Sequence, residues 1–281
     1  MRRLLICVLV MTLFARTSAF ASTYCFDGEP DYAYADGRTR IGIQKIEQDE
    51  LVYFVCDITL SDIAQLRAAF AGFYTGQSKS KREPVSVIAQ RNNAIFAINA
   101  DNPKAHSYGI IIRNGELMRK ASHATRHLLV VWPDGEMEII TQRDRKQAAV
   151  LAEELLAMGA WQSFEFGPAL VLNGEATDFA SFKKGFKLIS TGKSILEPRT
   201  AIGQLGTLRY LVIVVDGRAK GYSKGASLQT LQALFLRYGV KTAFNLDGGG
   251  STTLFFGGSV INRASSGSER SLSDILYISA E

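Results

Sequence analysis

The chain has 281 residues and a formal net charge of +5, a length that suits one large domain or two small ones. Three arginines in the N-terminal leader account for more than half of that charge, and without them the net charge is only +2. This balance predicts no nucleic-acid partner. Short basic clusters elsewhere in the chain are typical of solvated surface.

The first 21 residues have the pattern of a secretory signal peptide. Arg2 and Arg3 precede an apolar run over residues 4–15, and Ala19-Phe20-Ala21 offers a cleavage site. The run is shorter than the roughly 18 apolar residues that a membrane span needs. We therefore expect cleavage after position 21, a mature chain of residues 22–281 and a secreted or periplasmic protein without a stable membrane span. An uncleaved anchor is the alternative.

Two cysteines, Cys25 and Cys56, remain after the leader is removed. An even number of cysteines in an exported protein predicts a disulfide, here one that ties the mature N-terminus to an early strand. The sequence has no Cys-x-x-Cys pattern or His/Cys cluster typical of zinc sites, and His106, His123 and His127 are interpreted as non-ligands.

The rest of the chain is predicted to be rich in strands, because runs of β-branched and aromatic residues stand between turn signals. Helices are expected from Ser61 to about Gly76, from Arg145 to Met158 and, capped by Ser227, from Leu228 to Tyr238. Strands are expected at residues 41–46, 51–58, 85–89, 94–99, 108–112, 117–118, 127–132, 137–141, 169–172, 210–215, 242–246 and 274–279.

This order of elements predicts a single α+β domain of mixed, mostly antiparallel β-sheet with about three helices. Residues 210–246 follow a strand-helix-strand order, which predicts one local parallel pair. Residues 175–195 lack periodicity and are predicted to form a long loop, a feature that is often functional in compact domains.

The most informative stretch is Asp247-Gly248-Gly249-Gly250-Ser251-Thr252-Thr253, which follows a predicted buried strand. Glycine allows positive φ and a close approach to a ligand, and consecutive amides can form a concave anion site. The stretch could therefore present one carboxylate, several backbone donors and three hydroxyls at one point. The alternative is an ordinary Asp-Gly hairpin turn. Neither a P-loop nor a dinucleotide-binding pattern is present.

Other polar groups stand at the ends of predicted strands. They are Asn99-Ala100-Asp101, Arg199-Thr200 and Asp216-Gly217, followed by the Gly-x-Ser-x-Gly pattern around Ser223. Strand ends are common places for binding and catalytic groups. An ordinary turn or a surface arginine is the alternative at each position, and for Asp216 the alternative is a turn aspartate.

Taken in chain order, these motifs resemble the phosphodiester glycosidase domain family, whose members include the mammalian lysosomal uncovering enzyme and exported bacterial proteins. The resemblance covers roughly residues 85–280. Its most specific part is the Asn245 to Thr252 block, and the Pro198 to Gly203 block comes next. The other matching segments are Ile98-Asn99-Ala100, Gly167 to Val171 with Asn173-Gly174, Val215 to Arg218, Gly221 to Gly225 and Arg270 to Asp274.

The resemblance implies hydrolysis of a sugar-1-phosphodiester at the anomeric bond, which releases a free sugar and a phosphomonoester. Phosphate leaves as a stable anion, so charge stabilisation should matter more here than in ordinary glycosidases, which depend on a proton donor. A carboxylate is still needed to activate water or to stabilise an oxocarbenium-like sugar.

We therefore hypothesise that Asp247 is the principal catalytic carboxylate and Asp216 the second, although the sequence does not separate their roles. Glu165 is a possible acid, with a partly buried surface glutamate as the alternative. The expected phosphate- or sugar-binding groups are Asn99, Arg199, Thr200, Ser251, Thr252 and the amides of Gly248, Gly249 and Gly250, with Ser223 as a weaker helper.

Two features leave alternatives open. Family members usually continue the Asn99 motif with glycine and aromatics, whereas here the first aromatic residue is Tyr108. This departure concerns the sugar-facing side of the site and favours, as the alternative function, an envelope protein that binds glycan or phosphate without catalysis. The Gly-x-Ser-x-Gly pattern around Ser223 suggests a serine hydrolase as another alternative. A nucleophile elbow, however, needs its serine on a sharp turn directly between a strand and a helix. A structural envelope protein would rest on fold analogy alone.

No cofactor is expected. Asp101, Asp216 and Asp247 could supply oxygen ligands to calcium or magnesium, but no spacing signature supports a metal site. The expected partner is a phosphorylated carbohydrate substrate.

Overall fold

A computed structural model of the protein describes residues 23–72, 82–101, 103, 108–121, 126–141, 145–179 and 195–280. The predicted signal peptide, His106, His123 and most of the predicted long loop lie outside these residues. None of the helices in this part of the chain is long and apolar enough to cross a membrane.

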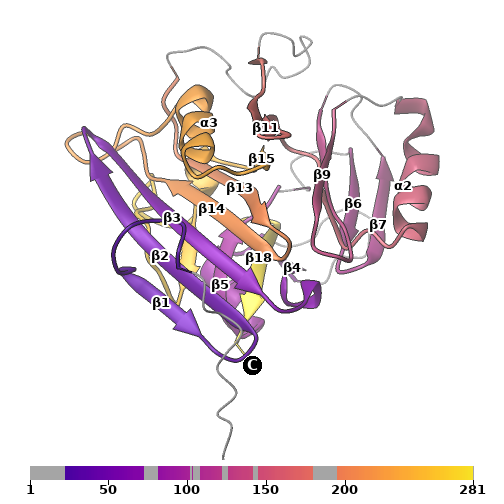
Figure 1. Ribbon diagram of the computed structural model, residues 1–281, viewed down its shortest axis with the longest axis horizontal. Coiled ribbons are helices and arrows are strands. Elements are labelled where there is room, and N and C mark those ends of the chain that lie inside the picture. The colour runs from indigo at the N-terminus through magenta and orange to yellow at the C-terminus, as the bar shows by residue number, and fades with distance from the viewer. Residues whose placement is uncertain are drawn as a thin grey trace, which may run out of the picture.

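The largest layer is an eight-stranded sheet in the order β1-β2-β3-β14-β13-β15-β11-β12. Figure 1 shows it with the helix α3 (Leu228–Arg237) on one face. Its strands are β1 (Tyr32–Ala35), β2 (Thr39–Gln48), β3 (Leu51–Leu60), β11 (Ala169–Leu172), β12 (Glu175–Ala176), β13 (Arg199–Gly206), β14 (Arg209–Val215) and β15 (Thr242–Asn245).

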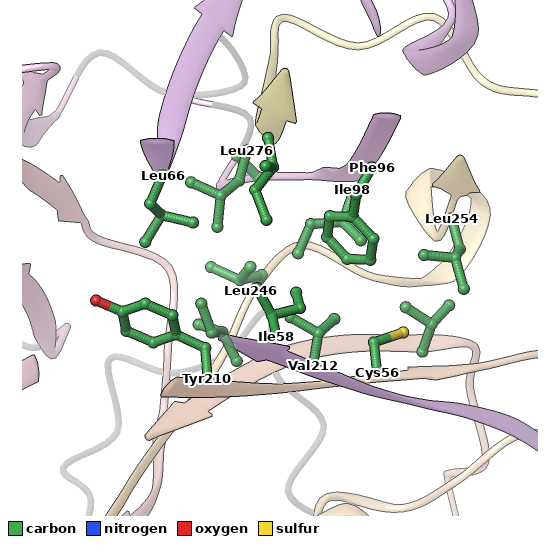
Figure 2. Packing of buried hydrophobic residues seen from close by; sticks show 14 of the residues in the cluster. Cys56, Ile58, Leu66, Phe96, Ile98, Tyr210, Val212, Leu246, Leu254 and Leu276 are labelled. Carbon is green, nitrogen blue, oxygen red and sulfur yellow. The ribbon is translucent and has the colours of Figure 1, made fainter. Parts of the chain in front are cut away.

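A second sheet, with five strands in the order β17-β16-β5-β18-β4, packs against the other face of the large sheet. Its strands are β4 (Arg67–Phe70), β5 (Ala94–Asn99), β16 (Leu254–Phe256), β17 (Ser259–Val260) and β18 (Asp274–Ser279). Figure 2 shows Cys56, Ile58 and Val212 of the large sheet pointing toward Phe96 and Ile98 of β5. The main apolar core therefore lies between the two sheets, and burial of such surface is the dominant favourable term in folding.

A smaller group of elements lies at the right of Figure 1. It consists of the three-stranded sheet β10-β8-β9, the hairpin β6-β7 and the helix α2 (Ala148–Ala157). Its strands are β6 (Gly109–Arg113), β7 (Glu116–Ala121), β8 (Leu128–Val131), β9 (Met137–Ile140) and β10 (Gln162–Phe164). Ala152 and Leu155 of α2 form its core with Ile110 and Ile112 of β6.

The predicted α+β class is confirmed, with three α-helices in the part of the chain that the structure describes. Both predicted hairpins are present as β6-β7 and β8-β9. The turn of the first has positive φ at Asn114 and Gly115, the geometry that an Asn-Gly turn supplies between twisted strands. The helix after Ser227 is also confirmed, because the Ser227 side chain accepts a hydrogen bond from Thr230 N.

Two predicted elements are wrong. The expected helix from Ser61 is a short 3-10 turn (Ile63–Gln65) followed by β4, which pairs with β18 along the sheet edge. Pairing with a distant strand overrode the helical spacing of the apolar residues. The expected strand 85–89 is the helix α1 (Val85–Arg91), which buries Val85, Ile88 and Ala89 against the five-stranded sheet. A short apolar run does not by its periodicity distinguish a strand from a buried helix.

The predicted local parallel pair is also wrong. The chain does pass from β14 through α3 to β15, but β13 lies between these two strands and pairs with each of them in the antiparallel sense. Every strand pair among the described residues is antiparallel. An earlier strand thus fills the position that a parallel neighbour would take.

Candidate active site

Backbone hydrogen bonds bring five strand ends together at one edge of the two sheets. Leu246 N donates to Thr200 O at 2.9 Å, which joins the end of β15 to the start of β13. Asp247 N donates to Ala100 O at 3.1 Å, which adds the end of β5. Gly167, just before β11, donates to Asn245 O at 3.1 Å, and Arg199 pairs with Val215 at the end of β14. Segments far apart in the sequence therefore meet around Asp247.

The glycine-rich stretch crosses from one sheet to the other and is not a hairpin turn. It leaves the large sheet at β15, forms one 3-10 turn (Gly249–Ser251) and enters the five-stranded sheet at β16. Gly248 N donates to the Asp247 side chain at 2.9 Å. A Cβ on Gly248 would lie 2.8 Å from Pro198 O, so glycine is required there by the approach of another backbone.

Arg199 lies beside this turn and has an exposed fraction of only 7%. Its Nε donates to Ala226 O at 3.1 Å. Its Nη2 is buried and has no hydrogen-bond partner among the described residues. Burial lowers the pKa of the guanidinium from its ordinary value. A buried cation without an anionic partner is costly, so this position favours a bound anion.

Two hydroxyl groups of the turn resemble Arg199 Nη2 in their burial and their hydrogen bonding. Ser251 Oγ and Thr252 Oγ1 are buried, and neither has a partner in the part of the chain described by the structure. Native proteins pair almost all buried polar groups, and exceptions often mark a bound ion or water. With Arg199 Nη2, they provide three unpartnered polar atoms around one glycine-rich turn, a set of donors suited to a tetrahedral oxyanion.

Two further arginines border the turn, and the sequence analysis assigned neither of them a role. A Cβ on Gly249 would lie 3.0 Å from Arg218 Nη2, and a Cβ on Gly250 would lie 2.7 Å from Arg270 Nη2. Arg218 also pairs with Glu197, with Nε and Oε2 2.6 Å apart. Arg270 is exposed and has no ion pair among the described residues. Its guanidinium lies against the Gly250 backbone and adds positive charge at the turn.

Asn99 and Thr200 link the segments of the site through hydrogen bonds. Asn99 Nδ2 donates to Asp247 O at 2.6 Å, and its Oδ1 accepts from Thr200 Oγ1 at 2.7 Å and from Thr253 N at 3.1 Å. Both side chains are buried. Their polar atoms bind each other and the backbone of the turn, and their predicted contacts with sugar or phosphate stay predictions.

Asp216 is buried, with 1% of its surface exposed, and accepts three kinds of hydrogen bond. The donors are Tyr222 Oη at 2.8 Å, Asn262 Nδ2 at 3.0 Å and Arg263 N at 3.1 Å. Burial raises the pKa of the Asp216 carboxyl, whereas these hydrogen bonds favour its charged form. Asn262 also bonds Thr252 O at 3.3 Å. Asp216 thus contacts the segment that follows the turn through Asn262 and Arg263 N.

Ser223 lies apart from the unpartnered groups. Its hydroxyl donates to Asp216 O at 2.6 Å and accepts from Val52 N at 3.0 Å, and the side chain is fully buried. The hydroxyl therefore bonds two backbone groups in the structure, and its predicted contact with substrate stays a prediction. α3 begins only at Leu228, so Ser223 does not have the strand-turn-helix setting of a nucleophile elbow.

Glu165 is buried near the same edge. Its backbone N donates to Asp101 Oδ2 at 2.9 Å, and its Oε2 accepts from Ile110 N at 2.9 Å. Asp101 and Asp274 both bind the Nη2 of the buried Arg113. This network fixes the segment that leads to Gly167, and therefore fixes Glu165 relative to the end of β15.

The possible metal ligands and the predicted disulfide can also be compared with the structure. Within the described ranges, no group of three or more His, Cys, Asp or Glu residues could hold a metal ion. Cys25 and Cys56 are both free, so the predicted disulfide is not formed in the structure. Cys25 N donates to Asp57 Oδ2 at 2.7 Å, next to Cys56 in β3. Burial raises the pKa of the Cys25 thiol to about 12.

Comparison with known proteins assigns the family. A family model described as phosphodiester glycosidase matches residues 87–279, more than half of the chain. The protein therefore belongs to the phosphodiester glycosidase family, as the motifs indicated. The chain is also 32% identical over 210 residues to the SPbeta prophage-derived uncharacterized protein YomE of Bacillus subtilis (strain 168). That alignment covers 71% of this chain and 30% of YomE, so the chain spans under a third of that relative.

Two solved structures have a similar fold. The catalytic domain of zebrafish N-acetylglucosamine-1-phosphodiester alpha-N-acetylglucosaminidase, auto-inhibited by its pro-peptide, aligns with a TM-score of 0.66 and 21% identity over 91% of this chain and 87% of that one. A hypothetical protein from Synechocystis aligns with a TM-score of 0.62 and 14% identity over 86% and 62% of the two chains. At these identities the likeness concerns the fold alone.

Proposed function

We propose that the protein is an exported hydrolase that cleaves the anomeric carbon–oxygen bond of a sugar-1-phosphodiester. The family and the fold support a hydrolase of this class. The observation that carries the proposal is the set of three unpartnered buried groups, Arg199 Nη2, Ser251 Oγ and Thr252 Oγ1, beside the carboxylate of Asp247. These groups are suited to a phosphate, and the carboxylate is suited to the sugar that the phosphate leaves.

In the proposed reaction, a water oxygen bonds to the anomeric carbon while Asp247 takes a proton from that water. The bond between the anomeric carbon and the phosphate oxygen breaks, and its electron pair leaves with the phosphate. The products are a free sugar and a phosphomonoester. Arg199 and the two hydroxyls stabilise the charge that develops on the leaving phosphate, and Arg270 adds positive charge from the exposed side.

The other residues of the site position these groups. Asn99 holds the Asp247 carbonyl, and Thr200 in turn donates to Asn99. Asp216 orients the chain after Thr252 through Asn262. Glu165 remains the candidate donor to the leaving oxygen, and its side chain is held in place by a hydrogen bond from Ile110 N. We further propose that the first 21 residues direct export and are removed, because they have the pattern of a signal peptide.

The test is release of free sugar from a panel of sugar-1-phosphodiesters, nucleotide sugars included, by protein expressed from its full-length chain. Asp247→Asn keeps an acceptor for Gly248 N but cannot take a proton, and it should lower turnover by at least about 100-fold. Glu175→Gln, an exposed change in β12, is the control and should keep full activity. Equal turnover in the wild type and Asp247→Asn would remove Asp247 from catalysis. Binding of phosphodiesters without turnover in the wild type would favour the non-catalytic binding protein.

A further inference from the structure

Arg126 is another buried arginine with a nitrogen that has no hydrogen-bond partner in the part of the chain that the structure describes, and the reaction above gives it no role. Only 2% of its surface is exposed. Its side chain makes no hydrogen bond or ion pair among the described residues, and its Nη1 is fully buried and unpartnered. A guanidinium keeps its positive charge in a protein, so its burial without an anion is destabilising.

Two aromatic rings hold this guanidinium in place. Arg126 Cζ lies 5.2 Å from the centre of the Tyr108 ring and 5.4 Å from that of the Phe166 ring. Such contacts attract a cation through the faces of the rings, but they leave the N–H donors at the edge of the guanidinium without acceptors. The rings therefore fix Arg126 in orientation and do not neutralise its charge.

Arg113 is a buried arginine that has acceptors for both of its terminal nitrogens, although its Nε has no partner among the described residues. Its Nη2 binds the carboxylates of Asp101 and Asp274, and its Nη1 donates to the carbonyls of Ile112 and Ser163. It also lies over an aromatic ring, with Cζ 4.4 Å from the centre of Phe164. Arg126 has ring contacts like those of Arg113 but no hydrogen-bond acceptor among the described residues, and this contrast favours an acceptor on a bound ligand.

A series of contacts connects Arg126 to the candidate active site. Phe166 is followed by Gly167, whose backbone O accepts from Asn245 Nδ2 at 2.9 Å, and Asp247 follows two residues after Asn245. Next to Arg126, His127 Nδ1 accepts from Ala169 N at 3.1 Å. The Oδ1 of Asn245 is itself buried without a partner in the described part of the chain. Unpartnered polar atoms thus run from Arg199, through Asn245, to Arg126.

Glu165 lies near the Arg126 end of this series of residues. It directly precedes Phe166, and a Cβ on Gly109, the neighbour of Tyr108, would lie 3.9 Å from Glu165 Cβ. Arg199, Ser251 and Thr252 already offer hydrogen-bond donors to a phosphate. The sugar of the substrate is therefore expected to bind near Arg126. We propose that Arg126, held between Tyr108 and Phe166, binds a second oxyanion carried by the glycosyl unit of the substrate. The substrate class is thus an acidic sugar linked to a phosphodiester. This inference rests on the proposed function.

The experiment compares three matched sugar-1-phosphodiesters: one with a carboxylate at the sugar C6, one with a phosphate there and one with a neutral hydroxymethyl group. The wild type should prefer one of the two acidic substrates, and the preferred one identifies the oxyanion. Arg126→Met retains an apolar side chain between the rings but no charge. It should raise KM for the acidic substrate by roughly 10- to 100-fold and leave the neutral one unchanged. Arg237→Met, at an exposed position of α3, is the control.

Two further readouts separate this inference from hydrolysis and from a structural role. Calorimetry with the free C6-carboxylate and C6-phosphate sugars should detect binding of at least one of them to the wild type and of neither to Arg126→Met, even if no substrate turns over. The melting temperature of Arg126→Met should equal or exceed that of the wild type, because an unpaired buried charge is removed. Hydrolysis that shows no preference for an acidic sugar and no effect of Arg126→Met would overturn the inference and leave the proposed function standing.

Discussion

The side-chain amide of Asn99 donates a hydrogen bond of 2.6 Å to the backbone carbonyl of Asp247, across 148 positions of the chain. The same side chain accepts hydrogen bonds from Thr200 and Thr253 through its Oδ1. One buried residue at the end of β5 therefore fixes the carboxylate-bearing residue, the start of β13 and the far end of the glycine-rich turn relative to one another.

Replacing Asn99 should uncouple Asp247 from this support. Asn99→Asp keeps the acceptor for Thr200 and Thr253 but removes the amide donor and places a carboxylate oxygen against the Asp247 carbonyl. We expect the free energy of unfolding to fall by about 1–3 kcal/mol and kcat to fall more than the affinity for inorganic phosphate. Urea denaturation, steady-state kinetics and calorimetry with phosphate measure the three quantities. A parallel loss of kcat and phosphate affinity would contradict a role confined to Asp247.

The unpartnered hydroxyls make an unusual prediction for stability. Ser251→Ala and Thr252→Val remove buried oxygens that have no partner among the described residues. Because Thr252→Val nearly conserves shape, the free protein should keep or gain stability, whereas most polar deletions at buried sites reduce it. Inorganic phosphate should stabilise the wild type in a thermal melt and stabilise the double variant much less. Equal stabilisation of both proteins by phosphate would place the anion elsewhere.

Gly250→Ala tests the arginine that lies on the turn. The added Cβ would stand 2.7 Å from Arg270 Nη2, the far end of a flexible side chain, so Arg270 moves while the backbone stays. Gly250 has no positive φ, so alanine causes no backbone strain there. We expect an unchanged melting temperature and a higher KM for phosphodiesters. Gly206→Ala, with nothing within 4 Å of its Cβ, should leave both quantities unchanged. An unchanged KM in Gly250→Ala would exclude Arg270 from substrate binding.

The carboxyls of Asp101 and Asp274 predict a pH dependence of stability. Burial, and next the charge of Asp101, raise the pKa of Asp274 well above its ordinary value. An acid whose pKa is raised in the folded state contributes fully to stability below its unfolded pKa of about 3.9, and loses that contribution as pH rises through the folded pKa. Asp274→Asn resembles the protonated acid and can still accept from Arg113, so it does not suffer this loss.

Accordingly, the stability of Asp274→Asn relative to the wild type should increase as pH rises from acidic to alkaline values. Chemical denaturation of both proteins across this pH range measures the difference. Asp134→Asn, a change in the exposed turn between β8 and β9, is the control and should show a flat difference. A difference for Asp274→Asn that falls with rising pH would show that Asp274 is ionised in the folded protein.

The cysteines and the leader give a prediction about processing. Cys56 belongs to the core between the two sheets, whereas Cys25 packs on the opposite face of the large sheet, and both thiols are free. Burial raises the pKa of the Cys56 thiol well above its ordinary value. Protein recovered after export should begin at Ser22, and its intact mass should correspond to two free thiols. A mass lower by two hydrogens would show a Cys25–Cys56 disulfide, which would contradict the structure.

Local patterns were enough for much of the fold. The Asn114-Gly115 turn, the Ser227 cap and the apolar strand β14 were predicted correctly because each depends on neighbouring residues. The short apolar run at Val85 was assigned to a strand, and the segment after Ser61 to a helix, because the deciding contacts come from the distant strand β18 and the five-stranded sheet. No local signal carries that information.

The candidate site divides in the same way. The order and spacing of residues are properties of the chain, so the sequence is enough to identify the functional groups that are available. They are the Asp247 carboxylate, the three glycines, the hydroxyls of Ser251 and Thr252, and Arg199. The folded arrangement was needed to show that Thr200 and Ser223 bond within the protein, that Arg199 Nη2 has no hydrogen-bond partner among the described residues, and that Arg270 lies on Gly250. The physical reason is that burial and pairing depend on which distant segments meet, and it is the unpaired buried group, not the residue type, that indicates a ligand.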